Sequence, residues 1–304
     1  MEFTSRPFTP ADFPAMQRLA AAHFADHMHV VDLPYRLSSW GLDDSANSRL
    51  WFLPSGQLAG WAVLHLPFWT LDFTCDPALD DLLLPEMLTW AEGRTLELRC
   101  EPINRECWFI NIFADQAQRL ALLTAAGWVD QSDLGEDSWS KVWLCRSADL
   151  PVREYRIPAG FTIRPLGSQA EVAAYVELHQ TTFGTKNMTI EWRSRTLLQP
   201  AYRPDLDIMV EAPDSSLVAF CIGWLLRTPD GRLHGQVEPL GCHPEYTRYG
   251  LGRLALAEVL RRLLQAGVES LHVETDNYRN TALGLYEHMG FALERNVLVL
   301  RKDY

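Results

Sequence analysis

Three short segments of the first half of the chain recur in the second half at similar offsets. Residues 161–166 (FTIRPL) repeat residues 3–8 (FTSRPF) 158 positions later. Residues 241–244 (GCHP) correspond to residues 72–77 (DFTCDP), and the prolines of the two segments are 167 positions apart. Residues 285–291 (LYEHMGF) correspond to residues 122–128 (LLTAAGW), which lie 163 positions earlier. Self-similarity at a nearly constant period predicts a tandem repeat of one α/β unit.

The segments between these anchors show the same order of elements in both halves. Helices are expected at residues 11–22 and 169–183, and a further helix of the first half around residues 83–90. Hairpins are expected at residues 50–66 and 207–225. Residues 144–160 contain prolines and a glycine but few apolar residues, which indicates a connector. We therefore place a domain boundary near residue 150, which gives domains 1–150 and 151–304.

Residues 236–267 predict a strand, a glycine-containing loop and an amphipathic helix. The helix begins near Leu251, has apolar residues at a 3.6-residue period, and ends at Gly267 in the position of a left-handed cap. The first N–H groups of a helix lack internal partners, so Gly250 and Gly252 would let an anion reach them. The alternative is that these two glycines only form a tight turn.

The C-terminal half resembles the GNAT N-acetyltransferase superfamily. The resemblance rests on the pattern Pro244-x5-Gly250-x-Gly252, the following helix, the strand at residues 271–275 and the LYEHMGF segment. It implies an α/β (α+β) fold of two tandem GNAT domains, each with a mixed central sheet flanked by helices. One departure is plain, because Thr247 occupies the loop position where the family has Gln or Arg.

The resemblance also implies a binding site for acetyl-coenzyme A. The loop and helix start would hold its pyrophosphate, and the backbone of the preceding strand would bond its pantetheine arm. Asn280 would contact that arm or, as we prefer, cap the helix that follows it. The residues implied are Leu240, Cys242, Arg248, Tyr249, Gly250, Leu251, Gly252, Arg253 and Asn280.

Two residues are expected to carry the chemistry. Glu238 lies on a strand just before the loop and is the candidate base that takes the proton of an amine; the alternative is a surface or ion-paired glutamate. Tyr286 precedes Gly290 at the family spacing and is the candidate acid for the leaving thiolate; the alternative is a core aromatic. GNAT catalysis is direct transfer, so Cys242 is interpreted as a core residue and not as a nucleophile.

The first half lacks the residues expected to bind the cofactor. A gapless alignment on Pro77 and Pro244 puts Leu83 at the position of Gly250 and Pro85 at that of Gly252. Leucine would fill a phosphate site, and proline has no N–H to donate. Leu123 stands in the position of Tyr286. We predict that the first half has the fold without cofactor binding or catalysis.

Composition restricts the class of protein. The net charge is −12, with −11 in residues 1–150 and −1 in residues 151–304, so nucleic acid is not an expected partner. The acidic half would favour a cationic substrate or simply keep the domain soluble. The six cysteines form no Cys-x-x-Cys pair, and neither a signal peptide nor a membrane span is evident, so a cytoplasmic protein is expected. No metal site is predicted, because His23, His27 and His29 have no cysteine close by.

These observations together predict an acetyl-CoA-dependent N-acetyltransferase that acts on an amine of a small molecule by direct transfer. The alternative is a non-catalytic module that binds or senses acyl-coenzyme A. A tandem architecture with one degenerate half is also found in mycothiol synthase, so a small amino-sugar conjugate is one candidate acceptor. The sequence does not determine the acceptor, the acyl length, the oligomeric state, or whether the N-terminal domain helps to form the acceptor pocket.

Overall fold

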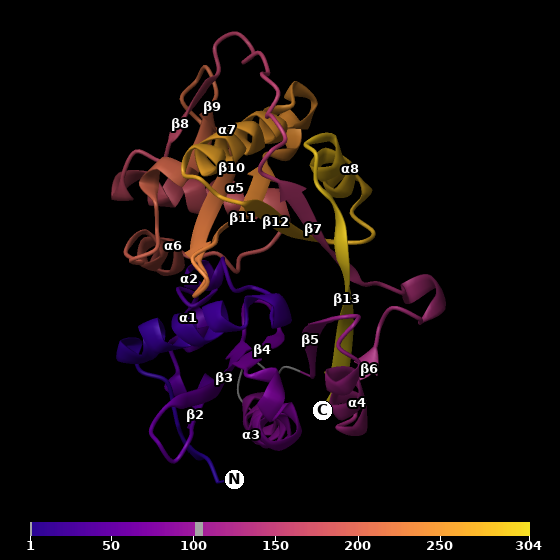
Figure 1. The fold of residues 1–304 in the computed structure, drawn as a ribbon. Coiled ribbons are helices and arrows are strands. Elements are labelled where there is room, and N and C mark those ends of the chain that lie inside the picture. The colour runs from indigo at the N-terminus through magenta and orange to yellow at the C-terminus, as the bar shows by residue number, and fades with distance from the viewer. Residues whose placement is uncertain (1, 101–105) are drawn as a thin grey trace.

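The chain forms two lobes that share one continuous sheet, with the first half below and the second half above in Figure 1. The computed structural model describes residues 2–100 and 106–304. The strands are β1 (Thr4–Arg6), β2 (Ser48–Phe52), β3 (Leu58–His65), β4 (Thr70–Cys75), β5 (Cys107–Phe113), β6 (Val129–Asp130), β7 (Lys141–Ser147), β8 (Thr162–Pro165), β9 (Asp207–Glu211), β10 (Leu217–Arg227), β11 (Leu233–Cys242), β12 (Ser270–Asp276) and β13 (Ala292–Asp303). The helices are α1 (Phe13–Ala22), α2 (Leu33–Arg36), α3 (Asp80–Arg99), α4 (Ala117–Ala125), α5 (Val172–Phe183), α6 (Ile190–Leu197), α7 (Leu251–Gln265) and α8 (Asn280–His288).

The sheet has a repeated topology. Its order is β1-β2-β3-β4-β5-β13-β7-β12-β11-β10-β9-β8, with β6 paired to β13. Among the strands of residues 2–100 and 106–304, only β4 with β5 and β11 with β12 pair in parallel, and these two pairs occupy equivalent places in the two halves. The predicted tandem α/β repeat with mixed sheets is therefore confirmed, and the two sheets merge into one.

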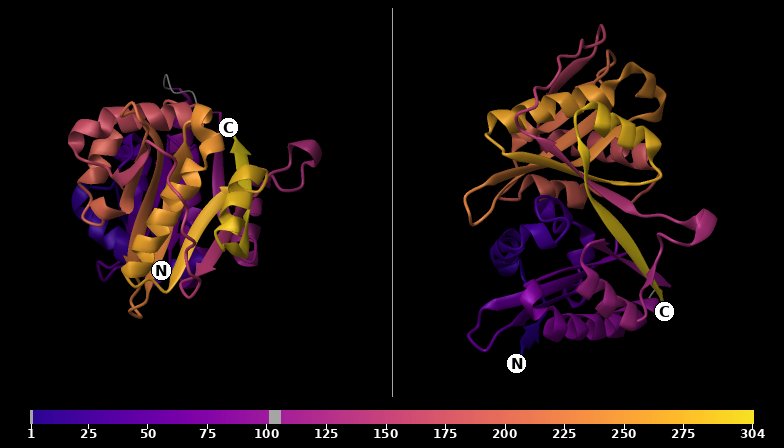
Figure 2. Two further views of the ribbon diagram at one scale, coloured as in Figure 1. Left: turned by 90° about the horizontal axis from the view of Figure 1, so that it is seen from above. Right: turned by 45° about the vertical axis from the view of Figure 1, so that its right-hand side comes forward.

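The two halves exchange strands where their sheets meet. β7, which precedes the predicted boundary at residue 150, pairs along its length with β12 of the second half. β13, the last strand of the chain, pairs with β5 of the first half and with β7. Figures 1 and 2 show β13 running from the upper lobe into the lower one. The predicted boundary lies in the connector, and hydrogen bonds of the sheet cross it.

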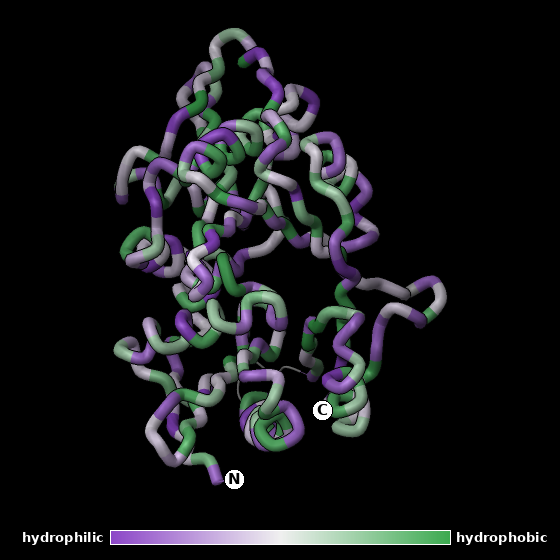
Figure 3. Tube along the Cα trace, in the orientation of Figure 1, coloured by the Kyte–Doolittle hydropathy of each residue, from purple (hydrophilic) through white to green (hydrophobic). Residues whose placement is uncertain are grey.

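Helices cover both faces of each half because the strand residues alternate in direction. In the second half, Val218 and Cys221 pack with the apolar face of α7, whereas Phe220 and Ile222 pack with α5. In the first half, Ala62 packs with α3 and its neighbours Trp61 and Val63 pack with α1. The outer helices accordingly alternate between hydrophobic and hydrophilic residues along the tube of Figure 3.

The two lobes also bond to each other directly through side chains. The indole N–H of Trp192 on α6 donates to the carbonyl of Tyr35 on α2 at 2.9 Å. Trp40 donates to the carbonyl of Asn187 at 2.9 Å, and the Asn187 amide donates to the carbonyl of Pro67 at 2.6 Å. These contacts fix α2 and the loops of the first half over one face of the second half.

Most predicted elements are found close to their predicted positions. The hairpins, α1, α5 and α7 are confirmed, and Gly267 after α7 has the left-handed φ of +84°. α3 differs, because it starts at Asp80 and extends to Arg99 where a helix around residues 83–90 was expected. Within residues 2–100 and 106–304, no helix is both long and apolar enough to cross a membrane.

Candidate active site

The strands β11 and β12 separate at the place where the candidate base lies. Their parallel pairing covers His234 to Gln236 on β11 and ends there. β11 continues to Cys242 against β10, and that pairing shifts register between Cys221 and Gly223. Glu238 and Pro239, joined by a cis peptide bond, lie just beyond the last residue paired with β12. The edge of β11 that faces β12 is therefore open for a ligand to bond with its backbone.

A short 3-10 helix, Pro244–Tyr249, separates the end of β11 from the N-terminus of α7. Gly250 has φ +70° and precedes Leu251, the first residue of the helix, so a glycine is required for the backbone to turn here. A Cβ placed on Gly252 would meet only the Cys242 side chain, at the ordinary contact distance of 3.7 Å. The space beside Gly252 is therefore open, as an anion site needs, although the backbone N–H of Gly252 lies within hydrogen-bonding reach of the Cys242 sulfur.

The charged and aromatic residues of this loop lie around that helix terminus. Arg248 and Tyr249 are exposed, and the centres of the Tyr249 and Phe161 rings are 5.5 Å apart. The guanidinium of Arg253 lies 4.8 Å from the centre of the Tyr155 ring, in the connector between the halves. Arg248 is therefore positioned at the surface, whereas Arg253 is held by an aromatic side chain.

A cavity of about 470 Å³ lies between the lobes and joins the predicted catalytic residues. Glu238, Leu240 and Tyr286 are on its wall. The second half contributes most of the wall, and the first half contributes a substantial part of it. The lining residues of the first half are His29, Tyr35, Arg36, Phe68, Thr70, Phe109, Asn111, Trp139 and Lys141.

Glu238 has the electrostatic properties of a base that works near neutral pH. It is half-buried, and the surface that it keeps faces the cavity. Burial, and after it the carboxylates of Asp32 and Glu274, raise the pKa of Glu238 to about 7 against the opposing charges of His29 and Arg36. Among the described residues no cation forms an ion pair with Glu238, so the alternative of an ion-paired glutamate is not what the structure contains.

His29 links carboxylates from both halves beside Glu238. Its Nδ1 lies 3.4 Å from Asp32 and its Nε2 lies 3.2 Å from Glu274 on β12. Burial opposes protonation of His29, but the two carboxylates outweigh it and raise its pKa. His29 has φ +56°, an uncommon backbone conformation for histidine that the surrounding packing has to maintain.

The remaining carboxylates of the wall are paired with cations. Lys141 forms an ion pair with Glu274, and it lies 3.4 Å from Asp276. Arg279 contacts Asp276 at 2.7 Å. Burial alone would raise the pKa of Glu274, but Lys141 and His29 lower it to about 2. Sequence reasoning missed His29 and Lys141, since no local pattern distinguishes them from other polar residues of the first half.

Tyr286 and Asn280 both lie on α8 but in different environments. Tyr286 is 7% exposed, and burial, followed by the charge of Glu238, raises the pKa of its hydroxyl. Asn280 is the first residue of the helix, is exposed, and is not part of the cavity wall among the described residues. The preferred interpretation of Asn280 as the cap is wrong, because the capping position is held by Arg279.

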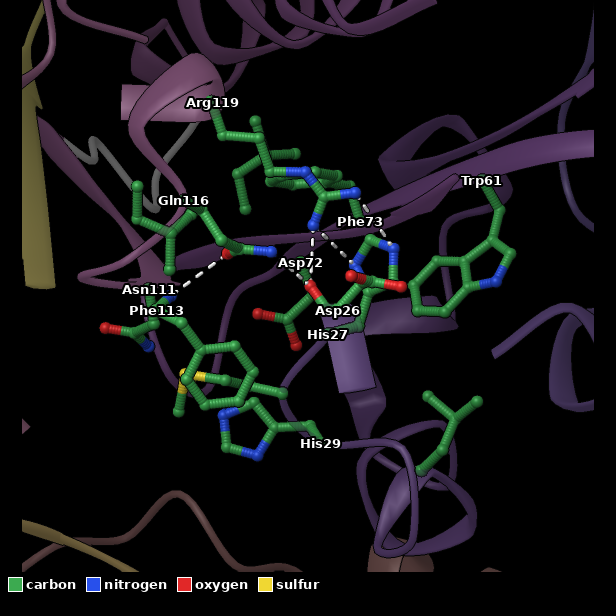
Figure 4. A pocket seen from close by; sticks show the side chains of 14 residues that line it. Asp26, His27, His29, Trp61, Asp72, Phe73, Asn111, Phe113, Gln116 and Arg119 are labelled. Carbon is green, nitrogen blue, oxygen red and sulfur yellow. Dashed lines mark hydrogen bonds between the residues drawn. The ribbon is translucent and has the colours of Figure 1, made fainter. Parts of the chain in front are cut away.

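The equivalent place in the first half is filled by its own side chains. β4 and β5 are paired only through Thr70 and Phe109, so these strands also separate. His27 lies in the gap, with its Nε2 2.8 Å from the carbonyl oxygen of Cys75. Arg119 donates to the carbonyl of Asp26 at 2.6 Å (Figure 4). It also donates to the carboxylate of Asp80 at 2.7 Å. The cavity that remains has a volume of only about 30 Å³.

The predicted reason for this difference needs correction. α3 begins three residues after Pro77, whereas α7 begins seven residues after Pro244, so a gapless alignment of the two loops is wrong. Leu83 is fully buried in the core and Pro85 lies within α3, so neither occupies a phosphate position. The helix start in the first half instead carries Asp80, which neutralises Arg119.

Part of the chain is similar in sequence to known acetyltransferases. Residues 152–291 match the acetyltransferase (GNAT) family. A mycothiol acetyltransferase of Kineococcus radiotolerans is 34% identical over 178 residues, which cover 57% of this chain and 54% of that protein. A mycothiol acetyltransferase of Nocardiopsis dassonvillei is 25% identical over 67% of this chain and 61% of that protein. The chain thus spans between about half and two thirds of the length of these relatives.

Solved structures resemble the whole chain in fold. A tandem GNAT protein from the clavulanic acid biosynthesis pathway superimposes with a TM-score of 0.67 at 12% identity, over 99% of this chain and 98% of that one. A GCN5-related N-acetyltransferase from Sphaerobacter thermophilus gives a TM-score of 0.66 at 22% identity, over 99% and 95% of the two chains. The similarity extends over both lobes and the strands that they exchange.

Proposed function

We propose that this tandem GNAT protein, whose residues 152–291 belong to the acetyltransferase (GNAT) family, transfers an acetyl group from acetyl-coenzyme A to an amine of a small molecule. The observation that carries the proposal is the position of Glu238 and Tyr286 on one cavity, where β11 and β12 separate. The second half would hold the reaction site. The first half would have no cofactor site of its own, because His27 and Arg119 occupy the equivalent gap.

The residues present fit the chemistry of acetyl-coenzyme A. Its phosphates would bind at the N-terminus of α7 with Gly250, Leu251 and Gly252, helped by the charges of Arg248 and Arg253. Its pantetheine arm would bond with the open backbone edge of β11 at Leu240 and Cys242. When bound, acetyl-coenzyme A supplies the acetyl group as a thioester.

Glu238 and Tyr286 would move the protons of the reaction. An aliphatic amine carries a proton near neutral pH and cannot attack a carbonyl until it loses that proton. The carboxylate of Glu238, with a pKa of about 7, would take it. The buried hydroxyl of Tyr286 would donate a proton to the departing thiolate, so the protons balance over the cycle.

Direct transfer from donor to acceptor is favoured over an acetylated enzyme. Cys242 is the cysteine next to the proposed cofactor site, and burial raises the pKa of its thiol. A thiol that keeps its proton is a poor nucleophile. Intact-mass measurement after incubation with acetyl-coenzyme A, without an amine, should show no acetyl adduct. An adduct that disappears in Cys242→Ala would instead establish a covalent intermediate.

The charges of the cavity favour an acceptor with one amine and an otherwise polar, uncharged body. Glu274 and Asp276 are already paired with cations of the chain, which leaves Glu238 as the carboxyl group available for an amine. The aromatic rings of Phe109 and Trp139 offer flat surfaces for the rest of the molecule. Since the relatives are named mycothiol acetyltransferases, the amine precursor of mycothiol is the first acceptor to test.

The test is a steady-state assay of thiol release from acetyl-coenzyme A with a panel of amines. The panel should contain the mycothiol precursor, aminoglycosides, polyamines and peptides with a free N-terminus. Calorimetry with acetyl-coenzyme A in the absence of amine should show one site per chain. Binding without turnover of any amine would support a sensing module, and two sites per chain would mean that the first half also binds the cofactor.

A further inference from the structure

A cluster of three potential metal ligands lies on the sheet, apart from the residues proposed to act in catalysis. Cys145 on β7 pairs in register with His272 on β12 and with Ala292 on β13. Glu294 lies in β13 at the register shift between Leu293 and Arg295. The cysteine sulfur, a ring nitrogen of His272 and a carboxylate oxygen of Glu294 all lie within 4.8 Å of one another.

The imidazole of His272 is held with one nitrogen aimed at this cluster. His272 is 4% exposed, and its Nδ1 has no hydrogen-bond partner. The nearest carboxylate oxygen, from Glu294, is 3.6 Å away from Nδ1. The other nitrogen, Nε2, lies 2.8 Å from the hydroxyl of Ser270, which in turn bonds to Nδ1 of His234 at 2.8 Å. A fixed ring whose second nitrogen is hydrogen-bonded is the usual arrangement of a histidine that ligates a metal.

We propose that Cys145, His272 and Glu294 bind a divalent transition-metal cation, with zinc the best match to the donor set. Zinc accepts sulfur, nitrogen and oxygen ligands in a tetrahedron. Bond lengths near 2.1 Å place a nitrogen and an oxygen ligand about 3.4 Å apart, close to the 3.6 Å separation of His272 and Glu294. A water molecule from the solvent side would take the fourth position, since the Glu294 side chain is 44% exposed.

An ion pair between His272 and Glu294 alone explains the arrangement of the three side chains less well than a metal site does. It leaves the position of the Cys145 sulfur unexplained. A bound cation would join β12 to β7 and β13, the two strands that the halves exchange, and would stabilise that junction.

Cobalt titration of the full-length protein, freed of metal with a chelator, tests the proposal. Thiolate bound to Co²⁺ gives a charge-transfer band in the near ultraviolet, which should saturate at one cobalt per chain and vanish on addition of zinc. Cys145→Ser should lose the band. Cys100→Ser, which changes an exposed cysteine, is the matched control and should keep it.

Two further variants distinguish a built site from chance binding. Ser270→Ala should keep the band but weaken cobalt affinity by about 10- to 100-fold, the usual effect of removing the partner of a ligating histidine. Zinc should raise the Tm of the wild-type protein and leave that of Glu294→Gln, an exposed and readily tolerated substitution, nearly unchanged. The absence of a band in the wild-type protein, or an undiminished band in Cys145→Ser, would overturn the proposal.

Discussion

Replacing Glu238 with glutamine should make the protein less active and more stable. Glutamine has the shape of the protonated acid but cannot take a proton, so turnover should fall by about 100-fold or more. The same change removes a carboxylate that burial and the neighbouring Asp32 and Glu274 make costly to ionise in the folded state. A loss of activity accompanied by a gain in stability would mark Glu238 as a functional residue kept at the expense of stability.

The gain in stability should depend on pH in a defined direction. The pKa of Glu238 is about 7 in the folded protein against 4.5 for an ordinary glutamate. The unfolded chain therefore binds fewer protons than the folded one between these values, and wild-type stability falls as pH rises through this range. Each pKa unit corresponds to 1.36 kcal/mol, so from about pH 5.5 to pH 8 the advantage of Glu238→Gln should grow by about 2 kcal/mol.

Urea denaturation of both proteins at the two pH values measures this difference. Glu269→Gln, an exposed glutamate before β12, is the control and should show no growth of the difference with pH. The pH dependence of kcat/KM should rise with a midpoint near 7 in the wild-type protein. A stability difference that is constant across pH would refute the argument, because it would mean that Glu238 ionises normally in the folded state.

Three further predictions concern the residues around Glu238. Tyr286→Phe should lower turnover with little change in the affinity for acetyl-coenzyme A measured by calorimetry, and unchanged turnover would remove Tyr286 from the mechanism. His29→Asn keeps a residue type that tolerates a positive φ but removes a positive charge that lowers the pKa of Glu238. The rise of kcat/KM with pH should therefore move to higher pH, and an unmoved profile would contradict this role of His29. Gly252→Val should weaken cofactor binding by at least about tenfold through steric block of the phosphate, whereas Gly93→Val, at an open helix position, should not.

Part of this arrangement follows from residues that are neighbours in the sequence. The apolar stripe from Leu251 onward determines α7, the left-handed turn at Gly250 needs a glycine, and alternation of side chains decides the face of β11 on which Glu238 lies. These features depend on periodicities and backbone preferences that act over a few residues, so a single sequence contains them. The repeated segments likewise predicted two copies of one unit, and the fold contains both copies.

The tertiary structure decided what these local rules leave open. Backbone hydrogen bonds are the same for every strand, so nothing in the sequence of β7 or β13 reveals that the two exchange places. That exchange, together with the packing of α2, brings His29 to Glu274 and Cys145 to His272 across the two halves. The electrostatic environment of the candidate base and the ligand cluster depend on contacts between distant residues, and only the folded chain defines these.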